Sequence, residues 1–150
     1  MIKLLDIHKV FGSLDLITYD GRVIPLTYEE MKKFDLDLEF GQMGEKFVED
    51  LQNGNTKIEV KTERDIWKTT GNIAVEIRYK NKPSGISTTG SSIWIHLLSD
   101  NDKIVGGYIF SVDYLKQKII DLKEKGKLKL VMGGDFNASQ MALIPRTELF

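Results

Sequence analysis

The stretch KIEVKTE, Lys57–Glu63, constrains the fold of this chain more than any other segment. Apolar and charged residues alternate along it with a period of two, which is the pattern of a β-strand. In such a strand Glu59, Lys61 and Glu63 share one face, and the residues between them take the other. The pattern predicts a strand that places a carboxylate beside an ammonium group. An ordinary strand with one solvated face has the same pattern.

The segments next to this strand indicate a helix before it and a second strand after it. Residues 41–52 have apolar side chains at helical spacing, and Asn53-Gly54 stops that helix. Residues 72–79, NIAVEIRY, alternate like the first strand. We therefore expect the two strands to pair as a hairpin across a polar loop at residues 64–71.

The second half of the chain continues the alternation of strands and helices. The Ser/Thr-rich residues 86–93 predict a short helix, and the apolar run WIHLL at residues 94–98 predicts a central strand. Residues 103–112 predict a further strand. Residues 112–125 have the pattern of a helix, with Gly126 as its stop. The tail predicts one or two closing strands.

The N-terminal part predicts a strand at residues 2–8, followed by a hairpin at Leu14–Leu26. Asp20-Gly21 is a strong signal for a two-residue turn in that hairpin. Thr27, with Glu30 three residues later, fits a capping box, so a short helix should begin there.

Length and composition suit one globular domain. The chain has 150 residues, of which 41% are hydrophobic and 29% charged. We expect a single domain, with an N-terminal strand and hairpin extension at 1–38, a core at 39–130 and closing strands at 131–150. The order of helices and strands predicts an α/β or α+β fold with a mixed central β-sheet flanked by helices.

Composition also excludes several classes of site. The absence of cysteine excludes disulfides, cysteine-ligated metal centres and cysteine nucleophiles. Neither a signal-peptide pattern nor an apolar run of roughly 20 residues is present, so we expect a cytoplasmic protein without a membrane partner. The net charge of −1 argues against a broadly basic surface, but residues 57–82 hold seven basic and four acidic side chains, a net of +3.

The Glu-x-Lys triplet in KIEVKTE suggests phosphodiester hydrolysis. Glu59 and Lys61 lie about 6.6 Å apart along a strand. A carboxylate can bind Mg²⁺, which activates water, and a lysine can stabilise the charge on the attacked phosphate. Glu45, Asp50 and Glu76 could converge on Glu59, and such a cluster of like charges requires a cation. If they point to solvent, the strand is only a solvated surface.

The surrounding sequence resembles the core of the PD-(D/E)xK nuclease superfamily. It is most similar to small phage-type members and to archaeal Holliday-junction resolvases. The matching pieces are Gly44-Glu45, the IEVKT run at Ile58–Thr62, TGN at Thr70–Asn72 and KPSG at Lys82–Gly85. The resemblance covers residues 41–112 and implies a restriction-endonuclease-like core.

The resemblance implies a nuclease, either an endonuclease or an exonuclease, that hydrolyses DNA, including structured or branched DNA, with Mg²⁺ or Mn²⁺. Glu59 matches the metal-binding acid of the motif, Lys61 its lysine, and Glu45 the acid that many resolvase-like members have on the first helix. Relatives of this type act as dimers, so a homodimer is implied. A phage origin would place the protein in the host cytoplasm.

The sequence leaves the identity of one metal ligand undetermined. Asp50 matches the earlier aspartate of the motif if residues 47–52 form a strand. Otherwise Glu76 or Glu63 must supply this ligand.

The residues expected to contact DNA are Lys57, Arg64, Lys68, Arg78 and Ser84. We interpret His96, alone in an apolar strand, as a core histidine, and Trp67 as an aromatic side chain packed at the rim of the domain. The alternative function is a non-catalytic nucleic-acid-binding or assembly module on the same fold.

Overall fold

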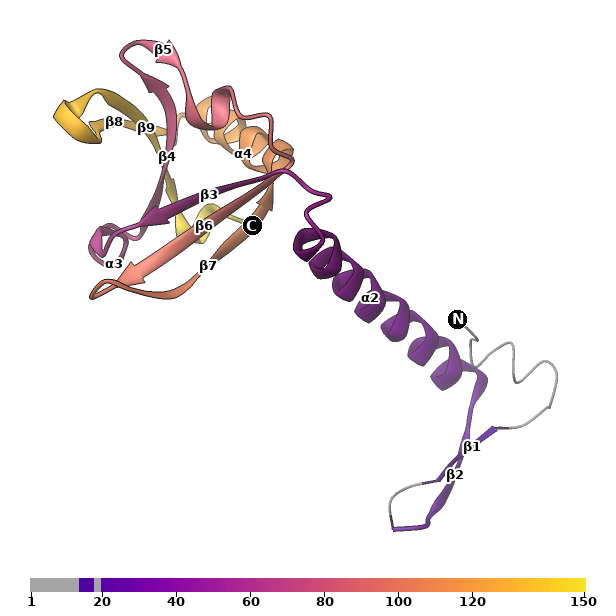
Figure 1. Cartoon of the computed structure of the whole chain (residues 1–150). Helices are drawn as coiled ribbons and strands as arrows, with labels where there is room; N and C mark the ends of the chain where they lie inside the picture. Colours follow the sequence, from indigo (N-terminus) through magenta and orange to yellow (C-terminus); the bar gives the residue numbers. More distant parts are fainter. Residues whose placement is uncertain (1–13, 18–19) are drawn as a thin grey trace. The chain divides into compact units, whose positions relative to one another are not determined.

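The computed structural model of the chain describes the backbone of residues 14–17 and all of residues 20–150 (Figure 1). The predicted strand at residues 2–8 lies outside this part. The chain divides into two compact units, one ending at Asn53 and one spanning Gly54–Phe150. The sequence predicts a boundary within one domain after residue 38, whereas the two units separate after Asn53, at the end of a long helix.

The first unit contains the expected hairpin. Strand β1 (Leu14–Ile17) pairs antiparallel with β2 (Val23–Leu26), and Ile17 lies opposite Val23. The hairpin prediction is confirmed, but the pairing of Ile17 with Val23 differs from the register that a two-residue turn at Asp20-Gly21 requires, so that turn is wrong. An ion pair of 2.8 Å joins Arg22 Nε to Asp20 Oδ2 in this connection.

One long helix, α2 (Tyr28–Gln52), follows the hairpin. The predicted capping box begins it: Thr27 Oγ1 accepts a hydrogen bond from the Glu30 N–H at 3.3 Å, and Glu30 Oε2 accepts one from the Thr27 N–H at 2.9 Å. The two helical segments expected from the sequence are therefore one helix. Gly41 lies inside it, and a glycine there costs only about 1 kcal/mol, less than breaking a continuous helix.

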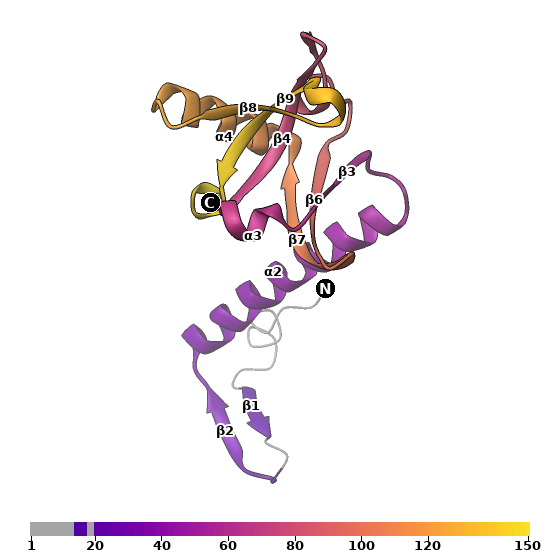
Figure 2. The same cartoon turned by 90° about the vertical axis from the view of Figure 1, so that its left-hand side faces the viewer.

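The second unit contains two sheets rather than the single mixed sheet expected (Figures 1 and 2). The fold class, a mixture of helices and strands, is confirmed. The three-stranded sheet has the order β3 (Ile58–Glu63), β6 (Ile93–Asp100), β7 (Lys103–Ser111). The four-stranded sheet has the order β5 (Lys82–Pro83), β4 (Asn72–Tyr79), β9 (Ser139–Pro145), β8 (Lys129–Gly133).

The expected hairpin between β3 and β4 does not form. β3 pairs in parallel with β6, and β4 pairs antiparallel with β5 and β9. The predicted polar loop at residues 64–71 instead contains a short helix, α3 (Ile66–Thr70). Gly71 ends it with a φ of 69° and starts β4 in the other sheet. Because a glycine adopts this left-handed conformation without steric cost, the turn is available here.

Most of the remaining predictions are confirmed. β6 lies between β3 and β7, as expected of a central strand. Helix α4 (Val112–Glu124) begins at Ser111, whose Oγ accepts a hydrogen bond from the Tyr114 N–H at 3.1 Å. The tail supplies two strands, β8 and β9. The helix expected at residues 86–93 is only the 3₁₀ turn η1 (Gly85–Ser87).

The core of the second unit is shared by both sheets and α4. Fully or almost fully buried side chains from β4, β6, β7, β9 and α4 form one cluster, which includes Ile73, Val75, Trp94, Phe110, Leu115 and Ile144. The two sheets are therefore fixed to each other by apolar packing, and side chains between them have defined neighbours. No helix in the described part of the chain is long and apolar enough to cross a membrane.

Candidate functional site

The charged face of β3 points inward. In the parallel pairing, Glu59 lies beside Trp94 and Lys61 beside His96. Side chains at paired positions project from the same face of a sheet. Trp94 and His96 are buried, so the charged side chains of β3 are on the inner face of the sheet, and Val60 on the opposite face is 52% exposed. An ordinary solvated strand would have the reverse orientation.

Glu59 and Lys61 form a close pair on this face. The Lys61 Nζ lies 2.8 Å from Glu59 Oε1, and the Thr89 hydroxyl donates to Glu59 Oε2 at 3.4 Å. The two charged side chains are 30% and 45% exposed. β3 is an edge strand of its sheet (Figure 2), so the pair lies at a rim that solvent reaches. The sequence prediction that a carboxylate and an ammonium group lie side by side is confirmed.

Glu63, the third charged residue of β3, belongs to a buried hydrogen-bond network. Its side chain is 10% exposed, and its Oε2 lies 2.7 Å from His96 Nε2 and accepts a hydrogen bond from the Ala74 N–H at 2.9 Å. The Trp94 indole donates to His96 Nδ1 at 3.3 Å. Because an indole N–H can only donate, Nδ1 must accept, so the His96 proton resides on Nε2 and points at Glu63.

This network decides two of the interpretations made from the sequence. His96 is 1% exposed and has a partner on each ring nitrogen, so the prediction of a core histidine is confirmed. Glu63 connects the two sheets, since Ala74 belongs to β4. Two protein donors already bind its Oε2, which indicates a structural role for this carboxylate.

Glu76 lies in the other sheet, not in a hairpin with β3. Its Oε1 accepts a hydrogen bond from Ser84 Oγ at 2.7 Å, and its Oε2 accepts one from Ser139 Oγ at 2.6 Å. The expected approach of Glu76 to Glu59 through strand pairing is therefore wrong. The segment Ser84–Thr89 nevertheless links the two carboxylates, because its first residue binds Glu76 and its last binds Glu59.

A glycine permits this link. Gly85 has a φ of 54°, and a Cβ atom built on it would lie 2.3 Å from the Glu76 carbonyl oxygen. Only glycine fits such a close approach of two backbones. The segment Ser84–Thr89 is held against β4 at the position of Glu76 for this reason.

The remaining predicted ligands lie in the first unit. Asp50 is part of helix α2 and forms an ion pair of 3.4 Å with Lys46. The strand at residues 47–52 that the Asp50 assignment required is therefore wrong, because the helix continues to Gln52. Glu45 lies on the same helix.

No group of three or more His, Asp or Glu side chains suited to a metal ion occurs within residues 20–150. A Mg²⁺ ion needs only one or two carboxylates, since water and phosphate oxygens complete its shell. Glu59, whose side chain is partly exposed and has one oxygen held by a single long hydrogen bond, suits this role. The donor set fits an ion held by Glu59, with Glu76 as a further carboxylate at the other end of the segment Ser84–Thr89.

The predicted DNA-contacting residues have different surroundings. The Lys68 ammonium forms an ion pair with Asp100, and the Ser84 hydroxyl is bound to Glu76. Lys57 and Arg64 are exposed at the two ends of β3. Arg78 lines a cavity on the other sheet. The five side chains do not form one uniform surface.

Trp67 confirms the interpretation of a packed rim aromatic. Its Nε1 donates to the Ser99 carbonyl at 2.8 Å, and the Arg146 guanidinium lies 4.9 Å from its ring centroid. Two residues of the site were not identified from the sequence, Thr89 and Ser139. Thr89 lies in the Ser/Thr-rich stretch at residues 86–93, whereas Ser139 is 63 residues from Glu76 and has no local signal.

Comparison of the chain with protein-family models, curated proteins and solved structures found no match.

Proposed function

We propose that this protein is a metal-dependent nuclease that hydrolyses DNA, on a restriction-endonuclease-like core of the PD-(D/E)xK type. The main support is the inward orientation of the Glu59–Lys61 pair on an edge strand. Removing charged side chains from water is costly. A strand that has Val60 on its other face would normally bury that apolar face and leave the charged face in solvent. An orientation against this preference is typical of a functional site.

Each side chain of the pair has a role in this proposal. Glu59 supplies a hard carboxylate oxygen for Mg²⁺ or Mn²⁺. A bound divalent ion lowers the pKa of an attacking water and offsets phosphate charge. Lys61 holds its positive charge beside Glu59 and stabilises the negative charge that develops on the phosphate. Thr89 orients Glu59 through its hydroxyl.

The other predicted groups complete the proposal. Glu76 is a second ligand, once its two serine hydrogen bonds rearrange. The protein works in the cytoplasm as a homodimer, with the N-terminal hairpin as the candidate contact, on a DNA that includes branched or structured forms.

One observation favours a second candidate, a non-catalytic nucleic-acid-binding or assembly module. Glu59, Glu63 and Glu76 each have hydrogen-bond or ion-pair partners within the protein. Carboxylates satisfied in this way stabilise a fold and need no cation.

Cleavage and metal binding together separate the two candidates. DNA junctions, flaps, duplexes and single strands, with matching RNA, are incubated with Mg²⁺ or Mn²⁺, and melting is followed with each ion. Glu59→Gln should lose both the metal-induced rise in Tm and cleavage. Lys61→Ala should keep the rise and lose cleavage by about 100-fold or more.

Thr62→Ala is the matched control, because Thr62 directly follows Lys61 and projects from the opposite face of β3. It should cleave within about twofold of the wild type. If the wild type shows no metal-dependent cleavage, and Glu59→Gln binds DNA as the wild type does, the module is correct and the nuclease is wrong.

A further inference from the structure

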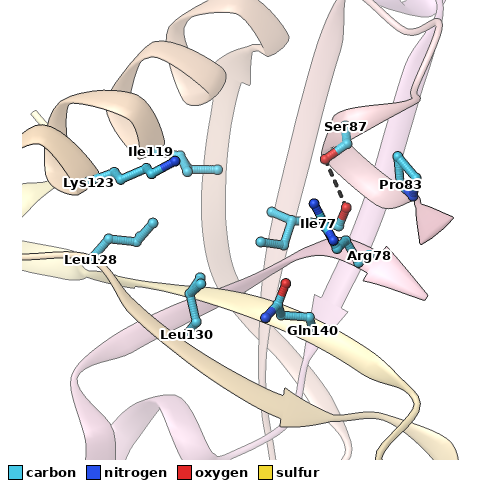
Figure 3. Close-up of a pocket in the computed structure, with 9 residues that line it drawn as sticks. All are labelled: Ile77, Arg78, Pro83, Ser87, Ile119, Lys123, Leu128, Leu130 and Gln140. Atoms are coloured by element: carbon cyan, nitrogen blue, oxygen red, sulfur yellow. Dashed lines mark hydrogen bonds between the residues drawn. The ribbon is translucent and has the colours of Figure 1, made fainter. Parts of the chain in front are cut away.

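A cavity of about 500 Å³ lies between α4, β4, β8 and β9, on the side of the four-stranded sheet that α4 covers (Figure 3). Its walls are mainly apolar. Ile77 comes from β4, Ile119 from α4, Leu130 from β8, and Leu128 from the segment that joins α4 to β8. A volume of this size accommodates a small organic ligand.

Three polar side chains line the same cavity from three elements: Arg78 on β4, Lys123 on α4 and Gln140 on β9. In the described part of the chain, none of the three has a hydrogen bond or an ion pair. No aspartate or glutamate lines the cavity. Two cations and a free amide therefore surround an apolar space without any compensating anion.

The fourth polar group shows how the cavity is fixed. The Ser87 hydroxyl donates to the Ile77 carbonyl at 2.9 Å, which is the dashed line in Figure 3. This bond fastens η1 to β4 next to the bulge at which the pairing of β4 with β9 shifts between Glu76 and Arg78. The part of the cavity wall that includes Arg78 is therefore held in place by the protein itself.

The lining defines the chemistry of the ligand. Arg78 and Lys123 favour a phosphate or carboxylate, and the guanidinium suits a phosphate in particular. The apolar walls favour a flat or bulky apolar body. The Gln140 amide offers both a donor and an acceptor, and an alkyl chain would leave both of them unpaired. A nucleobase edge presents the matching donors and acceptors, so a nucleotide satisfies all three features.

We propose that this cavity binds one unpaired nucleotide of the DNA substrate, with the base against the apolar walls and its phosphate at Arg78 and Lys123. The inference rests on the proposed nuclease function. Ser87 in the cavity wall is two residues from Thr89, which contacts Glu59. A nucleotide here is unstacked from its neighbours, so the preferred substrate has a single-stranded nucleotide near the cleavage point.

The test uses the full chain in EDTA, which removes any contribution from a metal ion at Glu59. Thymidine 5′-monophosphate is titrated while the methyl NMR signals of Ile77, Ile119, Leu128 and Leu130 are followed. We expect these signals to shift with a Kd of about 1 mM or below. Thymidine, inorganic phosphate and octyl phosphate should each bind at least about fivefold more weakly, because each lacks one part of the match.

Substitutions distinguish binding in this cavity from the general attraction of an anion to a basic surface. Arg78→Gln and Lys123→Gln should each weaken binding about fivefold to tenfold, and Gln140→Leu should abolish the preference for the nucleotide over octyl phosphate. Lys129→Gln is the matched control, since Lys129 is exposed on β8 and does not line the cavity. It should bind as the wild type does.

Two results would overturn the inference: no shift of the four methyl signals, or equal loss in Lys129→Gln and Arg78→Gln. Neither result depends on metal-dependent cleavage, which is measured separately. If the nucleotide binds as predicted and no DNA is cleaved, the cavity stands as a nucleotide site and only the nuclease proposal fails.

Discussion

The Nε2 atom of His96 lies 2.7 Å from Oε2 of Glu63, and this contact joins two neighbouring strands of the three-stranded sheet. Glu63 is on β3, His96 is on its neighbour β6, and the same carboxylate oxygen accepts a hydrogen bond from Ala74 on β4. Because the Trp94 indole donates to the other ring nitrogen, the histidine is held by both nitrogens. A polar chain thus crosses a largely apolar interior.

Removing His96 should therefore destabilise the protein strongly. His96→Ala leaves a buried carboxylate without one of its two donors and creates a cavity, which together cost about 3 kcal/mol. Glu63→Gln keeps the size and an acceptor for the Ala74 N–H, so it should cost less, about 1 kcal/mol. Urea denaturation measures both. A His96→Ala variant within about 0.5 kcal/mol of the wild type would contradict the network.

The orientation of β3 can be tested with the same substitution at two valines. Val60 is 52% exposed, whereas Val75 on β4 is fully buried. Val75→Thr places a hydroxyl in the core and should cost about 1–2 kcal/mol, while Val60→Thr should change the free energy of unfolding by less than about 0.5 kcal/mol. Equal costs at both positions would mean that the apolar face of β3 is the buried one.

Gly85 should not tolerate a side chain. Gly85→Ala places a Cβ against the Glu76 carbonyl and forces a left-handed φ, with a combined cost of about 3 kcal/mol or more. For a unit of this size, the melting temperature should fall on the order of 10 °C or more. Gly90→Ala is the control, because a Cβ there meets nothing within 4 Å and its φ is not left-handed. Similar melting of the two variants would refute this account of Ser84–Thr89.

Helix α2 should lose stability at acid pH through its capping box. The hydrogen bond from the Thr27 N–H, and that from the Thr27 hydroxyl, lower the pKa of Glu30 from its ordinary value. A lowered folded-state pKa means that this contribution is complete above the unfolded pKa of about 4.3 and is lost as the pH falls through the folded pKa. Glu30→Gln should remove this part of the pH dependence in circular dichroism melts. An unchanged profile would count against the capping box.

Several features of the fold could be predicted because they depend on neighbours in the sequence. The capping box needs only Thr27 and Glu30, and the stop of α4 needs only Gly126. The Glu59–Lys61 pair of the site could be predicted as well, because the alternation of side chains along a strand puts both residues on one face of β3. Thr89 and Ser139 were not, because their contacts with Glu59 and Glu76 span 30 and 63 residues.

The sequence by itself determined that Glu59, Lys61 and Glu63 project from one face of a strand, since alternation is a property of the extended backbone. Only the tertiary structure decided that this face points inward. That depends on the parallel pairing of β3 with β6, which sets the charged residues beside Trp94 and His96. The period of two along the strand determines which side chains share a face. Long-range packing, through Glu63, His96 and Ala74, determines which side faces the core.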